Sequence, residues 1–253
     1  MWTLDADADL PLWRYLEPRV APGPAIVAFS TRRGGVSPPP FDTLNLGRST
    51  GDHPEAVTEN RRRVLDPLGL SPDRLATAGQ VHGANVTRAD APGHYPACDA
   101  LVTRIPGLAL AISGADCLPI LLLAPGAVAV VHAGWRGLAA GAPRATLSTL
   151  CETAGVSPRR VQVHFGPCIR PCCYEVGPEV AERFDPAARR RVNGAWRLDL
   201  VAAARLELRG AAVLESAFAD TGACTSCRRD LYYSHRRDAA RTGRQWGVVA
   251  LRG

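Results

Sequence analysis

Three apolar segments follow one another in the middle of the chain, and they constrain the fold more than any other feature. They are residues 108–113 (LALAIS), 119–124 (PILLLA) and 127–132 (AVAVVH), separated by short turn-forming stretches. Short, nearly continuous apolar runs indicate strands that are covered on both faces. Pro125 and Gly126 interrupt the longest apolar stretch, so none reaches the roughly 18 residues of a membrane span.

The flanking segments alternate between strand and helix patterns. We expect further strands at 25–31, 160–166 and 211–218, and helices at 54–70 (ending near Gly69), 138–154, 177–184 and 199–210. Alternation of this kind predicts a mixed α/β fold with layered sheets and helices outside. A length of 253 residues, with 46% hydrophobic residues, is sufficient for one large domain spanning residues 1–253.

The net charge of +6 comes from arginine alone, since the chain contains no lysine. The arginines occur in short runs such as 61–63, 189–191 and 236–237, which are typical of solvated faces. We therefore expect no nucleic-acid partner, although single guanidinium groups are suited to binding phosphate. The acidic N-terminus lacks the basic and apolar regions of a secretory signal. This predicts a cytoplasmic protein, with no membrane partner, whose eight cysteines stay reduced.

Three residues at the ends of these segments carry ligand chemistry. His82 follows an extended segment, Cys117 lies between two apolar runs, and His132 ends the third run. Two imidazoles and a thiolate suit zinc or copper, and three protein ligands leave a fourth position open for water or substrate. The spacings do not themselves bring these residues together. Two hydrogen-bonded histidines and a buried cysteine are the simpler alternative.

Several longer motifs carry a family resemblance. They are STRRGG (30–35), LNLG (44–47), QVHGANV (80–86), SGADCLPILL (113–122), VHAGWRG (131–137), GPCIRPCCYEVGPEV (166–180) and CTSCRRDLYYSHRRD (224–238). With these the chain resembles the laccase-domain family, whose members are also called polyphenol oxidases, peptidoglycan editing factors and purine nucleoside phosphorylases. The resemblance implies a four-layer α/β/β/α fold and a metal site at His82, Cys117 and His132.

The same resemblance implies a zinc-dependent purine nucleoside phosphorylase. Its expected substrates are phosphate with adenosine, inosine or methylthioadenosine, and adenosine deaminase activity is a further expectation. We expect Arg32 and Arg136 to hold phosphate or ribose oxygens, and Asn45 and Gln80 to be hydrogen-bond partners of the substrate. Asp116 is the candidate carboxylate for orienting a metal-bound histidine. Each of these residues also fits a surface, turn or cap role.

Three other functions remain open at this stage. Cys117 with His132 or His82 as base fits a cysteine hydrolase that edits a peptidoglycan precursor. Copper-dependent polyphenol oxidation is less well supported. Met1 is the only methionine, so no axial methionine ligand is present, and the remaining histidines, at positions 53, 94, 164 and 235, form no HxH pair. A binding protein without catalysis is the third. A monomer is the default expectation for the oligomeric state.

Four further cysteines form two unusual pairs, Cys172-Cys173 and the CxxC of Cys224 and Cys227. Side chains of adjacent residues diverge, so we expect these thiols to pack in the core rather than to share a structural zinc ion. The pair Tyr232-Tyr233, together with Arg236, fits either purine stacking or core packing. His235 is expected at the surface.

Overall fold

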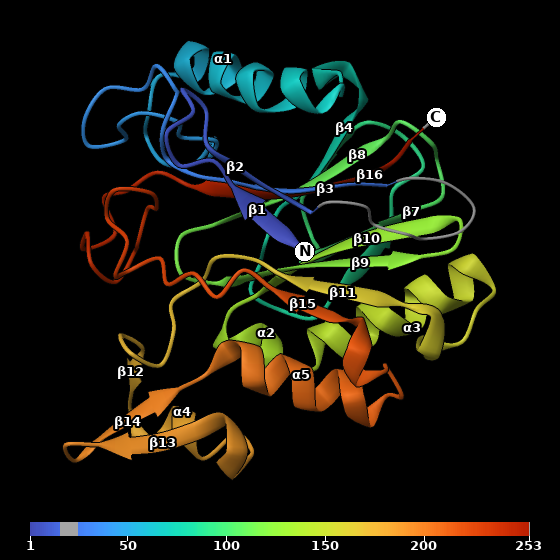
Figure 1. The fold of residues 1–253 in the computed structure, drawn as a ribbon, viewed down its shortest axis with the longest axis vertical. Helices are drawn as coiled ribbons and strands as arrows, with labels where there is room; N and C mark the ends of the chain where they lie inside the picture. Colours follow the sequence, from blue (N-terminus) through green and yellow to red (C-terminus); the bar gives the residue numbers. More distant parts are fainter. Residues whose placement is uncertain (16–24, 253) are drawn as a thin grey trace.

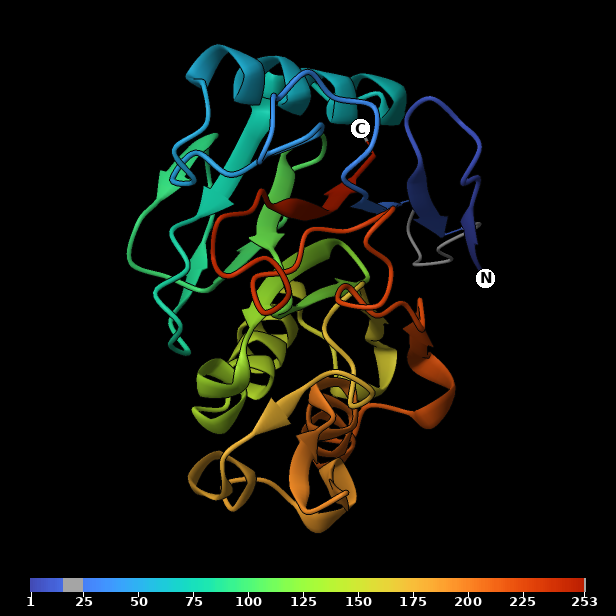
Figure 2. The same ribbon diagram turned by 90° about the vertical axis from the view of Figure 1, so that its left-hand side faces the viewer.

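Two stacked β-sheets form the centre of the molecule, and helices cover their outer faces (Figures 1 and 2). The computed structural model describes residues 1–15 and 25–252. Within them, α1 covers the first sheet, whereas α2, α3 and α5 cover the second, which gives the layers α/β/β/α. The mixed α/β fold with four layers is therefore confirmed.

The first sheet has the strand order β1-β2-β3-β16-β8-β4-β6 and the second has the order β15-β11-β9-β10-β7-β5. In the first sheet the strands are β1 Trp2–Leu4, β2 Leu12–Tyr15, β3 Ala25–Ser30, β16 Gln245–Leu251, β8 Ala109–Gly114, β4 Leu75–Ala78 and β6 Gly93–Tyr95. In the second they are β15 Phe218–Asp220, β11 Gln162–Phe165, β9 Leu118–Ala124, β10 Ala127–Ala133, β7 Ala100–Thr103 and β5 Val86–Arg88.

The apolar runs at the centre of the sequence became β8, β9 and β10, within one residue of the expected bounds. They do not share one sheet. β8 pairs with β16 and β4 in the first sheet, whereas β9 and β10 pair in the second. Residues 115–117 therefore cross from one sheet to the other, and this crossing is where the ADC motif lies.

Alternating side chains of β9 explain why its sequence is apolar throughout. Leu121 and Leu123 pack between the sheets, whereas Ile120 and Leu122 pack toward α3. Successive residues of a strand point to opposite faces, so a strand buried on both faces has no polar position. This burial fixes the strand ends, and with them the loops that follow.

The five α-helices of the described residues are α1 Pro54–Leu65, α2 Trp135–Ala139, α3 Ala142–Ala154, α4 Pro178–Ala181 and α5 Leu200–Gly210. Short 3-10 turns lie at Asp66–Leu68, Pro72–Arg74, Pro158–Arg160, Pro186–Ala188 and Glu215–Ala217. The first helical region ends at Gly69, as expected. None of the helices that the structure describes is long and apolar enough to cross a bilayer.

Two expectations for the elements were wrong, and one sheet was not expected at all. The single helix expected over 138–154 is divided into α2 and α3, because Gly141 adopts a φ of +79° and Pro143 follows it. The strand expected over 211–218 is mostly a turn, in which Ala212 has a φ of +70°. A third sheet, which the sequence did not suggest, has the order β12-β14-β13, with bounds Glu175–Val176, Ala195–Leu198 and Arg189–Val192.

His164 is the most unusual buried group in this core. It lies on β11 at 1% exposure, with the rings of Trp2 and Tyr15 at centroid distances of 5.5 and 4.4 Å. Neither ring nitrogen has a hydrogen-bond partner among the described residues. Burial, together with repulsion from the N-terminal ammonium, lowers the pKa of His164 to about 3. The imidazole is therefore neutral in the folded protein at neutral pH.

This burial makes the folded state sensitive to acid. The pKa of His164 is lower in the folded than in the unfolded chain, so its stabilising effect is complete above the unfolded pKa of about 6.5 and is lost as pH falls toward 3. Between pH 7.5 and 5.0 we expect His164→Leu to lose about 2 kcal/mol less free energy of unfolding than the wild type in urea titrations. The exposed-site control His53→Leu should follow the wild type, and equal losses in all three proteins would refute this account.

Candidate metal centre

His82, Cys117 and His132 lie close together, although they come from segments that belong to both sheets. His82 lies in the loop after β4, Cys117 in the crossing between β8 and β9, and His132 near the end of β10. One ligand atom from each lies within 4.8 Å of the others. The two imidazole rings are 4.8 Å apart and inclined at 70°. The structure thus brings together all three residues that the sequence marked as metal ligands.

Asp99 fixes the relative positions of His82 and His132. Its Oδ1 accepts from the backbone N–H of His82 at 2.9 Å and lies 3.0 Å from Nδ1 of His132, while its Oδ2 accepts from the N–H of Gly83 at 2.7 Å. The carboxylate is fully buried. Because Nδ1 of His132 binds Asp99, Nε2 is left for a metal, and the carboxylate sets both tautomer and orientation.

Asp116 was the sequence-based candidate for this orienting role, but its carboxylate is bonded to other residues. Oδ1 of Asp116 accepts from the hydroxyl of Thr225 at 2.6 Å, and Oδ2 accepts from the N–H of Arg236 at 2.7 Å. Asp116 therefore attaches the C-terminal segment to the crossing loop instead of holding a histidine. The sequence did offer one indication of Asp99 that was overlooked. It is an acidic residue directly before a buried strand, β7.

Backbone strain concentrates around the three ligands. Gln80, His82 and Asp116 adopt positive φ angles of 64°, 63° and 92°. Such conformations are unfavourable for residues with a side chain and persist where surrounding contacts enforce them. The hydrogen bonds from His82 and Gly83 to Asp99 supply that enforcement. Space is equally restricted, since a Cβ on Gly134 would lie 2.9 Å from Sγ of Cys117.

Electrostatics favour a thiolate at this position. Burial alone would raise the pKa of Cys117, but the adjacent His132 and His82 lower it to about 6. Burial likewise opposes the charge of His132, whereas the thiolate and Asp99 raise the pKa of His132 to about 9. Cys117 is thus a thiolate at neutral pH even in the metal-free protein, which is the form that metals bind.

A cavity of about 700 Å³ opens over the three ligands. Its basic lining residues are Arg48, Arg61, Arg136, Arg236 and Arg244. Among the described lining residues Asp116 is the only acidic one, so the cavity favours anions. The guanidinium groups of Arg48 and Arg136 form no hydrogen bond to a described residue. Aromatic side chains of Trp135 and Tyr174 also line the wall.

The five residues expected to bind substrate or support the ligands have different fates. Arg136 and Asp116 line the cavity, and Gln80 does so too, although its amide is already bonded to Ser113. Arg32 and Asn45 do not line it, so the structure does not bring these two residues to the candidate site. Arg32 pairs with Asp42 at 2.9 Å, and the fully buried Asn45 shapes its own loop through Thr50 and Asp52.

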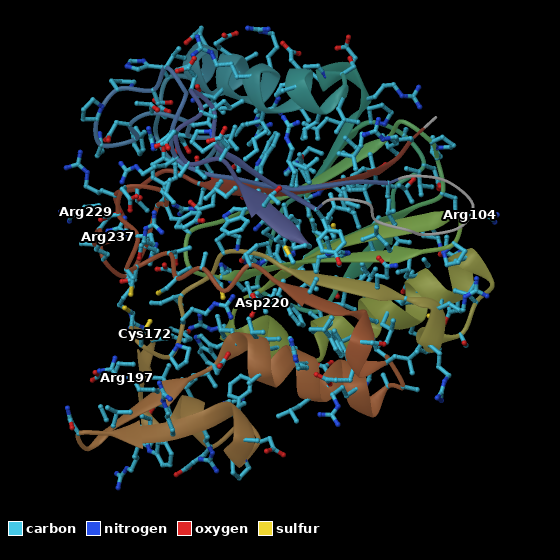
Figure 3. The ribbon with its side chains drawn as sticks, in the orientation of Figure 1. Arg104, Cys172, Arg197, Asp220, Arg229 and Arg237 are labelled. Atoms are coloured by element: carbon cyan, nitrogen blue, oxygen red, sulfur yellow. The ribbon has the colours of Figure 1, made fainter. Side chains whose placement is uncertain are left out.

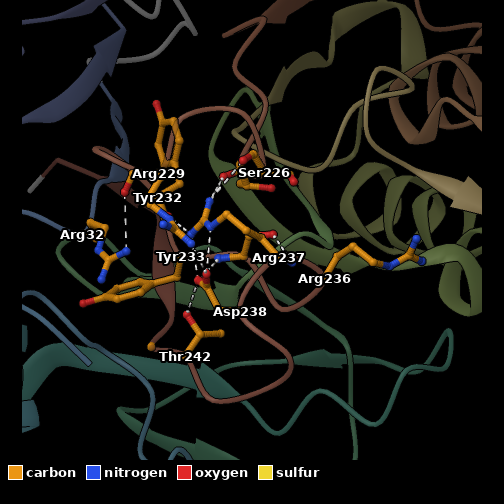
Figure 4. A network of polar contacts seen from close by, with 12 residues as sticks. Arg32, Ser226, Arg229, Tyr232, Tyr233, Arg236, Arg237, Asp238 and Thr242 are labelled. Atoms are coloured by element: carbon orange, nitrogen blue, oxygen red, sulfur yellow. Dashed lines mark hydrogen bonds and ion pairs between the residues drawn. The ribbon is translucent and has the colours of Figure 1, made fainter. Parts of the chain in front are cut away.

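Arg32 adjoins a network of polar contacts in the C-terminal segment, where its guanidinium donates to the carbonyl of Arg229 at 3.4 Å (Figure 4). Arg237 donates to the backbone carbonyls of Thr225 and Tyr232, and its guanidinium pairs with Asp238 at 2.7 Å. Figure 4 shows Arg32 and Arg236 on opposite sides of this network. Arg236 points away from it, and only Arg236 of the two lines the cavity.

The two tyrosines of the same segment belong to the core. Tyr232 and Tyr233 are fully buried. The Tyr232 hydroxyl accepts from Nε1 of Trp13 at 2.6 Å, and the Tyr233 hydroxyl donates to the carbonyl of Phe41 at 2.6 Å. Purine stacking by these rings is therefore excluded. His235 is exposed, as expected, but it also lines the cavity, so it lies at the rim of the site.

Comparison with known proteins agrees with the fold. Residues 26–252 match the family described as multi-copper polyphenol oxidoreductase laccase. The chain belongs to this laccase-domain family. A relative in Deinococcus radiodurans, named purine nucleoside phosphorylase, is 41% identical over 230 residues, covering 88% of each chain. A Pseudomonas aeruginosa relative with the same name is 40% identical over 242 residues, covering 91% of this chain and 96% of its own.

Solved laccase-domain structures share this architecture. The structure of YlmD from Geobacillus stearothermophilus superposes with a TM-score of 0.90 at 34% identity and covers 96% of both chains. YfiH from Bacillus licheniformis gives a TM-score of 0.88 at 29% identity, with 98% of this chain and 99% of that chain covered. The family resemblance inferred from the sequence motifs is therefore confirmed.

The role of Asp99 leads to a test by metal retention. Asp99→Asn replaces one acceptor oxygen with an NH₂ group that faces a buried N–H donor, so it should disturb His132 or the His82 loop. We expect zinc affinity at this centre, measured by competition with a chelator, to fall about 10- to 100-fold. Asp116→Asn is the matched control and should change zinc affinity less. The opposite order of the two variants would return the orienting role to Asp116.

Proposed function

We propose that this protein is a zinc-dependent purine nucleoside phosphorylase acting in the cytoplasm. The observation that carries the proposal is the His₂Cys donor set at the base of an arginine-lined cavity. Relatives that cover most of the chain bear the name purine nucleoside phosphorylase, which supports the same reaction class. We propose further that residues 1–253 act as one catalytic domain in a monomer.

The donor atoms fit a metal ion. Two imidazoles and a thiolate suit zinc and copper, and three protein ligands leave a position open for substrate. We favour zinc because phosphorolysis involves no electron transfer. When bound, zinc would supply Lewis-acid polarisation of an oxygen atom next to the reacting carbon. His82, Cys117 and His132 would hold it, and Asp99 would keep His132 oriented.

The other lining residues have roles in binding phosphate and nucleoside. In phosphorolysis a phosphate oxygen forms a bond to the anomeric carbon, and the bond from that carbon to the purine breaks. The guanidinium groups of Arg48 and Arg136 form no hydrogen bond or ion pair with a described residue, so they are the candidates for binding phosphate. Arg244 also lines the cavity. Burial lowers the pKa of Arg244, and the negative charges of Cys117 and Asp116 oppose that effect.

The nucleoside would lie against the aromatic side chains that line the cavity. Trp135 and Tyr174 offer faces to the purine, and Arg136 already stacks on the ring of Trp135 at 4.5 Å from its centroid. A cavity of about 700 Å³ is in the usual range for a small-molecule site. We propose adenosine, inosine and methylthioadenosine as substrates. Adenosine deamination would use the same pocket, but with water adding to C6 of the adenine ring and the amino group leaving that carbon as ammonia, while the bond to ribose stays intact.

A cysteine hydrolase is the second candidate, and one observation favours it. Cys117, His132 and Asp99 lie in the order nucleophile, base and orienting carboxylate, and the pKa of Cys117 is lowered to about 6. This arrangement would suit the editing of a peptidoglycan precursor. Chelation should leave such a hydrolase active and iodoacetamide should inactivate it, whereas a zinc phosphorylase should lose activity on chelation and regain it with zinc.

Copper-dependent polyphenol oxidation is not proposed. The described residues contain two groups with metal-ligand geometry, the His₂Cys centre and a cluster of four cysteines. A multicopper centre needs further histidines close together, and neither group contains more than two.

The central test is release of base by a variant without the thiolate. Cys117→Ala should lower phosphate-dependent release of hypoxanthine from inosine to background, because one metal ligand is lost. Cys151→Ala is the matched control, since this half-buried thiol lies on α3 outside the cavity, and it should retain wild-type activity. Equal far-UV circular dichroism would show that all three proteins are folded. Full activity of Cys117→Ala would rule out the proposed mechanism.

Phosphate binding can be tested separately from the metal centre. Arg136→Ala removes a charge-assisted contact to phosphate, so the KM for phosphate should rise at least about tenfold while zinc content stays unchanged. Arg33→Ala is the control, because Arg33 is exposed and lies outside the cavity. An unchanged KM for phosphate in Arg136→Ala would remove Arg136 from the phosphate site.

A further inference from the structure

Four cysteines gather at a second place, away from the cavity. Sγ atoms of Cys172, Cys173, Cys224 and Cys227 all lie within 4.8 Å of one another. Figure 3 shows sulfur atoms beside Cys172, between β12 and the C-terminal segment that carries Arg229 and Arg237. Cys172 and Cys227 are exposed, and Cys173 is half-buried. The sequence-based expectation that these thiols pack in the core was wrong for Cys172 and Cys227, whereas Cys224 is buried as expected.

A turn overcomes the divergence of the adjacent cysteines. The backbone N–H groups of Cys173 and Tyr174 both donate to the carbonyl of Arg170 at 2.8 Å, which curls the chain at this point. Both thiols of the pair therefore approach the same partner. Sγ of Cys172 lies 3.6 Å from Sγ of Cys227, and Sγ of Cys173 lies 3.3 Å from the same atom.

Backbone pairing brings the two cysteine pairs together. Cys168 and Cys224 form a parallel β-bridge, in which the N–H of Thr225 donates to the carbonyl of Cys168 at 3.0 Å. The N–H of Arg170 points at Sγ of Cys224 at 3.5 Å. Hydrogen bonds of this kind stabilise a thiolate sulfur, and a CxxC turn is a common source of two zinc ligands.

The spacing of the sulfurs fits a tetrahedral ion. A Zn–S bond of about 2.3 Å places the corners of a tetrahedron about 3.8 Å apart. Two sulfur pairs lie at 3.3 and 3.6 Å, and no pair exceeds 4.8 Å, so only small shifts would bring all four to one ion. We propose that Cys172, Cys173, Cys224 and Cys227 form a second, structural zinc site with four thiolate ligands.

This site would fix one wall of the cavity. Tyr174, next to Cys173, lines the cavity, and Thr225, next to Cys224, donates to Asp116. Arg236 lies further along the same C-terminal segment, and its guanidinium donates to the carbonyl of Glu175 at 2.8 Å. An ion shared by the two segments would therefore hold them together beside the cavity without contacting substrate.

Metal content of purified variants tests the proposal. After zinc loading and gel filtration, mass spectrometry of the metal should give two zinc ions per wild-type chain and one in Cys227→Ser. Cys117→Ala should also give one, because it loses the other centre, and the double variant should give none. Cys151→Ser is the matched control and should keep two. No zinc in Cys117→Ala, or two zinc ions in Cys227→Ser, would overturn the proposal.

Three further measurements do not depend on the folding of Cys227→Ser. Cobalt loaded into Cys117→Ala should give the intense thiolate-to-cobalt absorption of a tetrathiolate centre, and its absence would overturn the proposal.

In the wild-type protein, zinc should protect all four thiols from iodoacetamide, as read by peptide mass spectrometry, and chelation should expose them. A Cys173–Cys227 disulfide in protein purified anaerobically with zinc would also contradict the site. None of these readouts depends on nucleoside turnover, so they can fail while the proposed phosphorylase function stands.

Discussion

The carboxylate of Asp99 is the interaction on which the candidate active site depends. It is fully buried, and it binds the backbone at His82 and Gly83 as well as the ring of His132. One side chain thus holds a strained loop of the first sheet against a strand of the second. A buried anion is costly without partners, and here three donors satisfy it. Loss of any of these contacts would leave the two histidines without a fixed relative position.

The stacked sheets fix the position of the third ligand, Cys117. β8 and β9 are buried and belong to different sheets, so the short crossing between them has little freedom. Cys117 lies in this crossing, and Gly134 leaves just enough space for its sulfur. The C-terminal segment then closes the site through Asp116 and contributes Arg236 and Arg244 to the cavity. The cavity is therefore assembled from segments that are distant in sequence but fixed by the same core.

The sequence predicted those parts of the fold that depend on local pattern. Apolar runs located β8, β9 and β10 closely, and the family motifs pointed to His82, Cys117 and His132. The hairpin of β13 and β14 was missed because its arginines have no apolar alternation. Arg32 and Asn45 lie in motifs of the family, yet their polar groups satisfy the buried loop instead of reaching the cavity.

Other parts of the site could not be predicted from local pattern because they depend on tertiary contacts. Arg48, Arg61 and Arg244 reach the cavity from two separate segments, and no spacing rule joins them. The cysteine cluster depends on the turn at Arg170 and on the bridge between Cys168 and Cys224. Adjacent side chains diverge in a regular strand, but those of Cys172 and Cys173 do not, because the chain turns at Arg170.

Anomalous diffraction at the zinc edge, from crystals grown with zinc and phosphate, tests the central claim most directly. The account predicts a zinc peak bound by His82, Cys117 and Nε2 of His132, with phosphate beside it against Arg136. Absence of a zinc peak at these three residues, in crystals whose protein releases purine base in the presence of phosphate, would contradict it.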